Sequence, residues 1–407
     1  MTAVDVWRRP DLLDALRAGD FGALLRAYRK WTGCSQSSVG ARCGLSQPDV
    51  SEMENGRRKV TSAAVRQRVL DGLGVPAGLR PLAAGSLALP TMAPSPDADT
   101  ADRLTSAVES DRLDRPVLDY MAVMLAEHRR IEDRLGARVL LPVVAAQAVI
   151  LERLTRAAPQ QLHDDALALM SQYSQFLAWM RHDQRDDRAA LALFSAAESQ
   201  AQEAGDASMA ATVLSMKAHL AWGAGDPLAC VRFAEAAQWA SPKITPGACG
   251  MAAQMQARGL AVLKDADGAD RAVDRARALL GEAAEHWEDE PSWLYFYQGP
   301  WIELQVGALQ LDLGRAGRSI DLLTRALAEL DPGYVRDGAW YRAILSRALL
   351  EAGDAEHAAA TALAVLPDAR ETNLYALDHV KGTALRLARR AGSLEPVRAL
   401  AEQLRAA

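Results

Sequence analysis

Apolar residues recur along most of this chain at the three- and four-residue spacing of amphipathic helices. Near the N-terminus, a helix that Asp20 can cap has one apolar face, formed by Phe21, Leu24, Leu25 and Tyr28. From Asp111 onward the same spacing continues throughout, and there is almost no alternation of apolar and polar residues of the kind that marks a strand. The pattern therefore predicts an all-α protein.

Two short helices joined by a tight turn are predicted between Ser35 and Lys59. Ser35 can cap the first helix, and Gly44 at its end can adopt the left-handed conformation that reverses the chain. Ser46 can cap the second helix, where Pro48 in the first turn costs no hydrogen bond. Their shared apolar face consists of Val39, Cys43, Leu45, Val50 and Met53. The polar residues at the leading ends suit a helix-turn-helix that reads DNA.

A further helix is predicted after this pair. Thr61 or Ser62 can cap it, and Gly74-Val75-Pro76 ends it. Its core face consists of Val65, Val69, Leu70 and Leu73. The loop before it is basic, with Arg57, Arg58 and Lys59. We therefore expect residues 1–83 to form a domain of four or five helices.

The segment from Arg29 to Arg57 resembles, without a gap, the phage-repressor (Xre-type) helix-turn-helix domain. The matching residues open the two helices, form the turn and close the motif: Gln36, Gly44, Gln47, Glu54, Asn55, Gly56 and Arg57. The resemblance implies that Glu54 pairs with Arg29. One departure is Gly40, where the family usually has Ala. Glycine inside a helix costs about 0.5–1 kcal/mol, which predicts a less rigid first helix.

The resemblance also implies a division of labour between base and phosphate contacts. The residues expected at base edges are Gln47, Pro48 and either Ser51 or Glu52. Gln47 suits a bidentate contact with adenine, and Glu52 either accepts a hydrogen bond from cytosine or repels wrong phosphates. The residues expected at the DNA backbone are Gln36, Ser37, Asn55, Arg57, Arg58 and Lys59. The expected partner is a double-stranded operator, palindromic because two copies of one short reading helix discriminate better than one.

The charge distribution separates the N-terminal region from the rest. Residues 1–80 contain 13 Lys or Arg and 8 Asp or Glu, whereas the remaining residues contain 33 and 44. The net charge of −6 thus divides into +5 and −11. A basic head on an acidic body is expected where only the head faces phosphate, although a chance fluctuation is the alternative.

Residues 84–110 contain three prolines and many small residues. This composition predicts a semi-flexible linker between the head and a second domain at 111–407. The alternative is an ordered, proline-rich surface segment.

The region after Asp111 has recurrent breaks between apolar helices. They lie at residues 204–206, 224–226, 315–317, 352–354 and 391–393. The last three glycines are 36 and 39 residues apart, close to the period of a helical-hairpin repeat. The region at about 160–407 resembles degenerate tetratricopeptide (TPR) repeats. The resemblance implies an α-solenoid of about six hairpins with a concave face, and residues 111–160 are expected to cap it.

The whole arrangement resembles actinobacterial regulators with an Xre-type head and a TPR-like body. It is also similar to the peptide-sensing regulators of Gram-positive bacteria. The resemblance implies a transcriptional regulator, a homodimer whose body mediates dimerisation. The alternatives for the body are that it senses a peptide, a small molecule or only its twin. An interaction scaffold or adaptor, in which the groove binds a protein and the head does not bind DNA, is the alternative from another class. An antitoxin-like role is a third, for which the large body is unnecessary.

An aromatic cluster at residues 293–301 is the one candidate for a signal site. It contains Trp293, Tyr295, Phe296, Tyr297 and Trp301. Aromatic residues with polar tips suit a ligand groove, and core packing of the repeat helices is the alternative. Core packing is also expected for Trp222, Trp239, Trp287 and Trp340.

No motif predicts an enzyme, a metal site or a cofactor. The seven histidines are scattered, and the chain has no phosphate-binding glycine loop or nucleophile elbow. The run His182–Asp187 suits a solvated first turn of a helix, with metal binding as the alternative. The four cysteines form no CxxC pair and are expected to pack as apolar residues. With no long apolar run and no signal-peptide core, the expected location is the cytoplasm, with no membrane partner.

Overall fold

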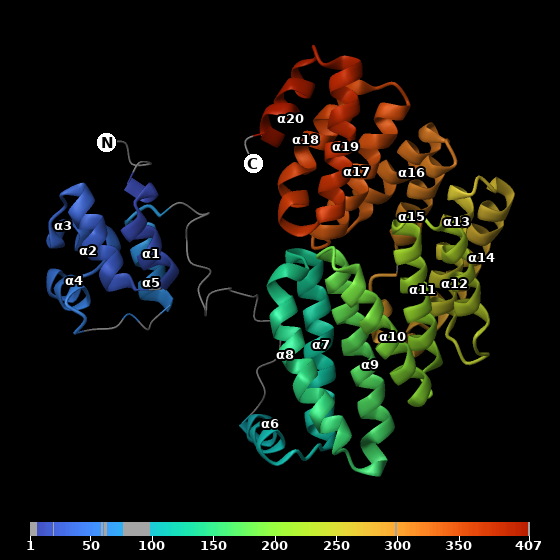
Figure 1. Cartoon of the computed structure of the whole chain (residues 1–407), viewed down its shortest axis with the longest axis horizontal. Coiled ribbons are helices and arrows are strands. Elements are labelled where there is room, and N and C mark those ends of the chain that lie inside the picture. The colour runs from blue at the N-terminus through green and yellow to red at the C-terminus, as the bar shows by residue number, and fades with distance from the viewer. Residues whose placement is uncertain are drawn as a thin grey trace. The chain divides into compact units, whose positions relative to one another are not determined.

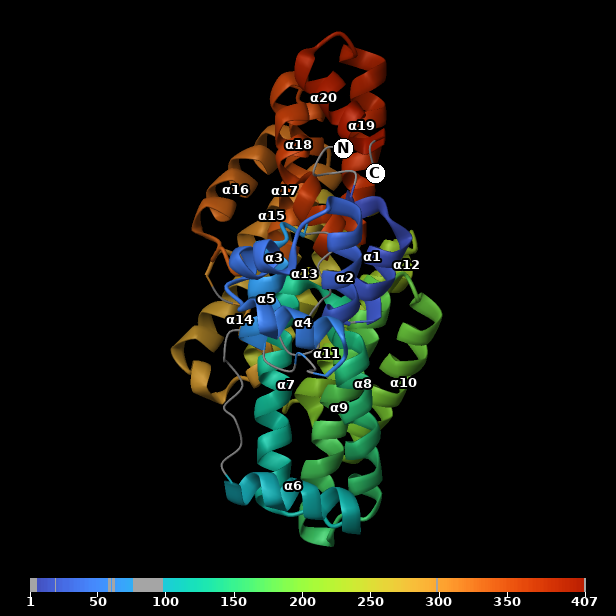
Figure 2. The same cartoon turned by 90° about the vertical axis from the view of Figure 1, so that its left-hand side faces the viewer.

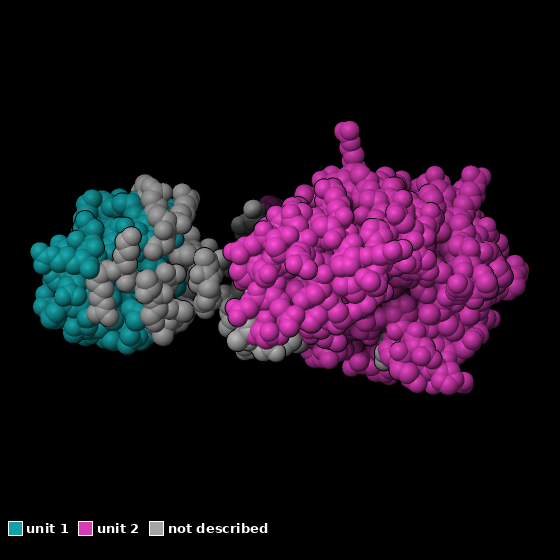
Figure 3. Space-filling view, turned by 90° about the horizontal axis from the view of Figure 1, so that it is seen from below, with its two compact units in different colours: residues 1–94 teal, residues 95–407 magenta. Residues whose placement is uncertain are grey.

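The computed structural model describes residues 6–18, 20–57, 60, 63–75, 98–297 and 299–405. These described residues form helices and connecting turns and contain no strand, which confirms the all-α prediction (Figure 1). The chain divides into two compact units, Met1–Pro94 and Ser95–Ala407 (Figure 3). None of the described helices is long and apolar enough to cross a lipid bilayer.

The first unit is a small helical domain. Its elements are η1 (Val6–Arg8), α1 (Pro10–Ala18), α2 (Phe21–Thr32), α3 (Gln36–Cys43), α4 (Gln47–Glu54) and α5 (Ala63–Gly72). The apolar face predicted for α2 is buried, and so are Val39, Cys43, Val50 and Met53 of the helix pair. The sequence analysis did not identify η1 and α1, which add Trp7, Leu12 and Leu16 to the core.

The predicted helix ends are present in the first unit. The Asp20 side chain accepts a hydrogen bond from the Ala23 N–H at 2.9 Å, and Ser35 does the same for Ser38 at 3.1 Å. Gly44 ends α3 in the left-handed conformation, with φ of 63°. Thr61 and Ser62, expected to cap α5, lie outside the described residues.

The second unit is built from consecutive helical hairpins (Figure 2). Its helices are α6 (Ala98–Ser110), α7 (Arg115–Leu135), α8 (Ala137–Arg156), α9 (Gln160–Asp183), α10 (Asp187–Glu203), α11 (Ala207–Gly223), α12 (Pro227–Trp239), α13 (Pro246–Val262), α14 (Ala266–Glu285), α15 (Trp301–Asp312), α16 (Ala316–Glu329), α17 (Val335–Glu351), α18 (Ala355–Thr372), α19 (Leu374–Ala391) and α20 (Glu395–Arg405). Two short 3-10 turns, η3 (Trp287–Asp289) and η4 (Ser292–Leu294), precede α15.

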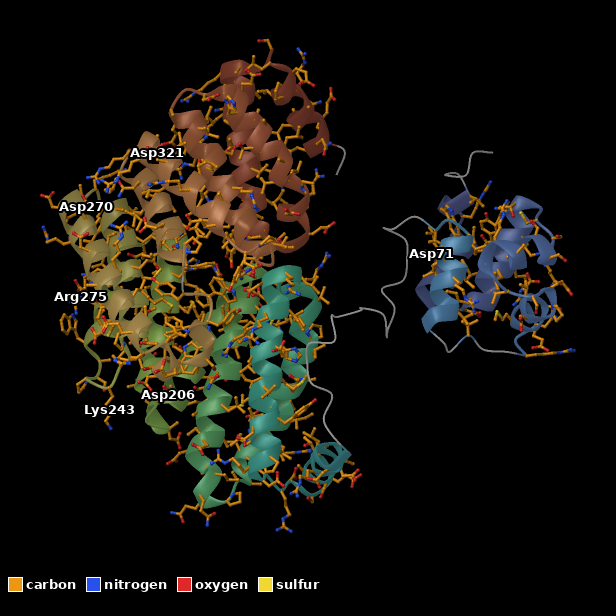
Figure 4. All side chains as sticks on the ribbon, turned by 180° about the vertical axis from the view of Figure 1, so that it is seen from behind. Asp71, Asp206, Lys243, Asp270, Arg275 and Asp321 are labelled. Atoms are coloured by element: carbon orange, nitrogen blue, oxygen red, sulfur yellow. The ribbon has the colours of Figure 1, made fainter. Side chains whose placement is uncertain are left out.

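The Ala-Gly-Asp breaks form the hairpin turns because each residue has a separate geometric task. Gly205, Gly225 and Gly353 have φ of 72°, 80° and 93°, which other residues rarely adopt. The next residue then caps the following helix. Asp206 (Figure 4) accepts from the Met209 N–H at 2.8 Å, and the equivalent distances for Asp226 and Asp354 are 2.9 and 3.1 Å.

The hairpins bring distant helices together. Helix α7 packs against α17 and α18 as well as against its neighbours α8 and α9. The buried Arg336 of α17 joins this contact, donating to Glu132 of α7 and to Asp183 of α9, both at 3.0 Å. The inner helices of the second unit therefore surround a common interior.

The predicted linker at 84–110 differs from the structure at its C-terminal end. Residues 98–110 form α6, which packs on α7 and α8 and buries Ala107. The apolar spacing of Leu104, Ala107 and Val108 is that of a short helix, which the many small residues around it obscured. The remaining residues, 84–97, lie outside the described part of the chain.

Candidate functional site

Helix α4 presents a polar side to solvent and an apolar side to the core. Ser46 and Asp49 form a reciprocal capping box at its N-terminus. Val50 and Met53 are buried beneath the helix. The residues predicted at base edges lie on the other side, with Gln47, Pro48 and Glu52 exposed and Ser51 half-buried.

A hydrogen-bonded chain of side chains connects α2, α3 and α4. Gln47 Nε2 donates to Gln36 Oε1 at 2.8 Å, and Gln36 Nε2 donates to Glu54 Oε2 at 2.7 Å. The Arg29 guanidinium donates to both oxygens of Glu54, at 2.7 and 3.0 Å. The pair between Arg29 and Glu54 is the one that the family resemblance implied. Because Glu54 is only 6% exposed, this chain fixes Gln36 and Gln47 on a buried anchor.

The residues predicted at the DNA backbone have different placements. Ser37, Asn55 and Arg57 are exposed, whereas Gln36 is half-buried within the chain of hydrogen bonds. The Asn55 side chain lies 3.5 Å from the Ser51 hydroxyl. Arg58 and Lys59 lie outside the described residues. One basic residue missed by the sequence analysis, Arg68 of α5, donates to the Gly44 carbonyl at 3.1 Å beside the turn.

Close packing explains the glycine at position 40, which the family resemblance did not suggest. A Cβ at this position would lie 2.6 Å from the Leu45 carbonyl oxygen and 3.4 Å from Val50. Gly40 therefore allows α3 to approach the turn and α4 closely, instead of only loosening its own helix.

A cavity of about 460 Å³ lies inside the second unit. It is lined by α7, α9, α11, α13, α15, α17 and α19, together with the segment around η4. Each of these described helices is the first helix of its hairpin. This cavity is in the size range of small-molecule sites.

The predicted aromatic cluster lies at this cavity. Trp293, Tyr295, Tyr297 and Trp301 all line it, as does Phe296. Three of them, Trp293, Tyr297 and Trp301, are also buried members of the main apolar core. The Trp293 indole donates to Thr212 at 3.1 Å, and the Tyr295 hydroxyl donates to Asp133 at 2.5 Å. The cluster therefore combines both expected features, packing in the core and facing the cavity.

Further residues line this cavity that were not predicted to do so from the sequence. Trp179 and His182 lie three residues apart near the end of α9, and His219 and Trp222 have the same spacing near the end of α11. The His219 ring lies 5.4 Å from the rings of both Trp179 and His182. This repeated spacing on successive inner helices was the available signal. The other aromatic residues of the lining are Phe176, Trp340, Tyr341, Tyr375 and His379.

Two sequence-based interpretations require correction. His182 and Asp183 are buried at the end of α9 and do not belong to a solvated first turn, which begins only at the Asp186 cap of α10. The reason is that Arg336 and the other inner helices cover them. Trp239 is 69% exposed, so its predicted core packing is wrong; it lies at the end of α12 under Arg275. Among the described residues, no group of His, Cys, Asp and Glu has the arrangement of a metal site.

Burial shifts the titration of several cavity groups. It raises the pKa of Asp133 to about 7 and lowers the pKa of Arg129 to about 10. Burial, helped by nearby arginines, lowers the pKa of His379 to about 4 and the pKa of His219 well below its usual value. Both imidazoles are therefore neutral at neutral pH.

Comparison with known families gives a match in the first unit only. Residues 20–83 match a family described as a helix-turn-helix domain. No curated protein shows significant similarity to the chain. The protein thus has an N-terminal helix-turn-helix domain followed by a long all-helical region of hairpins, and the helix-turn-helix domain suggests DNA binding.

Proposed function

We propose that this protein is a sequence-specific DNA-binding transcriptional regulator of the Xre type. The observation that carries the proposal is the chain of hydrogen bonds from Gln47 through Gln36 to the buried Glu54. Folding alone does not require hydrogen bonds that connect the exposed Gln47 and the half-buried Gln36 to a buried carboxylate. Such positioning is what a base-reading side chain needs, since loose side chains lose specificity.

The geometry gives each glutamine a distinct task. Gln47 uses one amide hydrogen for Gln36 and keeps its carbonyl oxygen and second N–H, the pair that matches adenine N6 and N7. Gln36 likewise keeps one N–H for a phosphate oxygen. Ser37, Asn55 and Arg57 are exposed and can contact the sugar–phosphate backbone.

The second unit is assigned to dimerisation and signal binding. A single α4 covers few base pairs, whereas a homodimer reads two half-sites about one helical turn apart. The TPR-like body supplies surface for this pairing, and its inner cavity is suited to a small-molecule signal. The proposal includes no catalytic activity.

A gel-shift titration with the DNA upstream of the protein's own gene, at two salt concentrations, tests the proposal. Selective binding that weakens steeply with salt is expected, because released counterions dominate the salt dependence. Arg57→Ala should weaken binding to all duplexes about equally and reduce the salt slope by about one. Absence of any shift at low salt would favour the scaffold alternative.

A further inference from the structure

The cavity of the second unit contains four arginines with different partners. Arg336 is paired with Glu132, Asp183 and Asp337, and Arg185 is paired with Asp378. Arg129 and Arg258 form no ion pair with any carboxylate among the described residues. Within the described part of the chain, these two guanidinium groups are therefore buried cations without an ion-pair partner, although Asp312 acts on Arg258 at longer range.

Of the two arginines, Arg258 has more of the features of a ligand-binding group. Its side chain is 2% exposed, and its guanidinium stacks on Trp222, 3.7 Å from the ring centre. Nη1 lies 3.4 Å from Nδ1 of His219, whose ring is neutral at neutral pH and accepts there in the tautomer protonated at Nε2. Among the residues that the structure describes, Nε and Nη2 have no hydrogen-bond partner. Those two atoms form one edge of the guanidinium, with two parallel N–H donors. Both atoms are buried, so a ligand at this edge has to displace the side chains that cover it.

Such an edge matches the two oxygens of a carboxylate. The surroundings favour a single negative charge, because the carboxylates around Arg336 in the same cavity would repel a dianion. Beside Arg258, the rings of Trp222 and Trp340 lie 6.4 Å apart and at 79° to each other. Flat apolar groups pack well against such faces.

We infer that the cavity binds an organic monocarboxylate with a flat apolar body, its carboxylate on the Nε–Nη2 edge of Arg258 and its body against Trp222 and Trp340. The cavity volume of about 460 Å³ suits such a ligand. A buried cation without an ion-pair partner also costs folding free energy, so a ligand that supplies a direct partner accounts for its presence.

The inference names a ligand class for the proposed signal-binding role, and its regulatory meaning rests on that role. Binding is measured on the full chain without DNA, so failure of ligand binding and failure of DNA recognition are separate results. The probes are benzoate, 2-naphthoate and anthracene-9-carboxylate, each compared by calorimetry with its neutral amide and with inorganic phosphate. At least one acid should bind, at least tenfold more tightly than its amide, and phosphate should not bind.

Two variants locate the site. Arg258→Met should reduce acid binding at least tenfold and, without ligand, leave the melting temperature unchanged or higher, because it removes a buried charge that has no ion-pair partner. Arg275→Met is the matched control, since Arg275 also stacks on a tryptophan, Trp239, but at the periphery of the body (Figure 4). It should bind the acid as the wild type does.

Arg258→Lys, which keeps the charge and loses the fork, replaces Arg258→Met where the latter does not fold, and should also bind at least tenfold more weakly. The inference is overturned if no acid binds, if acids and amides bind equally, if phosphate binds instead, or if the Arg258 variant that folds binds like the wild type.

Discussion

The side-chain amide of Gln47 donates to the Oε1 of Gln36 at 2.8 Å, so the two glutamines that open α4 and α3 move as a unit. Gln36 is in turn fixed by Glu54 at 2.7 Å. The position of the proposed base-reading side chain thus depends on a residue of the preceding helix. Gln36, which the sequence predicted to contact phosphate, therefore also positions Gln47.

Gln36→Ala should therefore weaken operator binding and also reduce discrimination between operator and scrambled DNA. A lost phosphate contact alone would weaken both duplexes equally. Released from Gln36, Gln47 should lose about 1–3 kcal/mol of base discrimination. Fluorescence anisotropy with both duplexes measures the ratio, and Ser37→Ala, the neighbouring exposed residue, is the control. An unchanged ratio would show that Gln36 acts on phosphate only.

Arg29→Met should lower the free energy of unfolding of the first unit by about 2–3 kcal/mol, because Glu54 stays buried with Gln36 as its remaining neutral partner. Arg29→Met combined with Glu54→Leu should recover most of the loss, since it removes both charges. Hydrogen exchange of the α2 and α4 amides measures this unit separately from the second. Equal destabilisation in the single and double variants would contradict the assignment of a buried ion pair.

Gly40→Ala should destabilise the first unit by about 1–3 kcal/mol, although alanine is the better helix former by about 1 kcal/mol. The new Cβ would lie 2.6 Å from a backbone oxygen, that of Leu45, which cannot move away easily. Gly281→Ala on α14 is the control, because nothing lies within 4 Å of its added Cβ, and it should be stabilising. Hydrogen exchange of each unit measures whether each substitution stabilises or destabilises it. A stabilising Gly40→Ala would contradict the close approach of α3 to the Leu45 carbonyl.

Asp133 should contribute stability to the second unit at pH 6 that is lost as the pH rises to 8. Burial raises the pKa of Asp133 to about 7, so between about pH 4 and pH 7 the folded chain holds a proton that the unfolded chain has released. The contribution of Asp133 is therefore lost as the pH rises through this window, and at pH 6 it exceeds that at pH 8 by about 1 kcal/mol. The buried, neutral His219 and His379 act in the opposite direction, because the unfolded chain binds protons on them as the pH falls.

Urea unfolding of the second unit at several pH values, for the wild type and for Asp133→Asn, measures this contribution. The difference in unfolding free energy between the two proteins should shift by about 1 kcal/mol in favour of the wild type from pH 8 to pH 6, because the amide carries no titrating proton. Asp119→Asn, an exposed position on the same helix, should show no such shift against the wild type. A difference that shifts in favour of Asp133→Asn as the pH falls would have the wrong sign for a buried, proton-holding Asp133.

The sequence was sufficient for features that depend on local chemistry. The caps at Asp20 and Ser35, the turn at Gly44 and the Ala-Gly-Asp hairpin breaks follow from capping and from the freedom of glycine. The pair of Arg29 and Glu54 was accessible only through the family resemblance, because 25 residues separate its members.

The cavity was not accessible in this way. His182, His219 and His379 are far apart in sequence and meet only because successive hairpins repeat the same inner face. The unpaired state of Arg258 depends on which carboxylates the packing places near Arg336 instead. Sequence spacing contains no information about such long-range pairing, whereas the aromatic cluster at 293–301 was visible because it is contiguous.

The central claim is that this protein reads DNA sequence through Gln47. Repeated selection from a random duplex library, with the full chain and with Gln47→Ala, tests it most directly. The wild type should enrich an inverted repeat with half-sites about one helical turn apart, and Gln47→Ala should lose the preference at one base pair in each half-site. A wild-type selection that enriches no motif, or the same motif from both proteins, would contradict the claim.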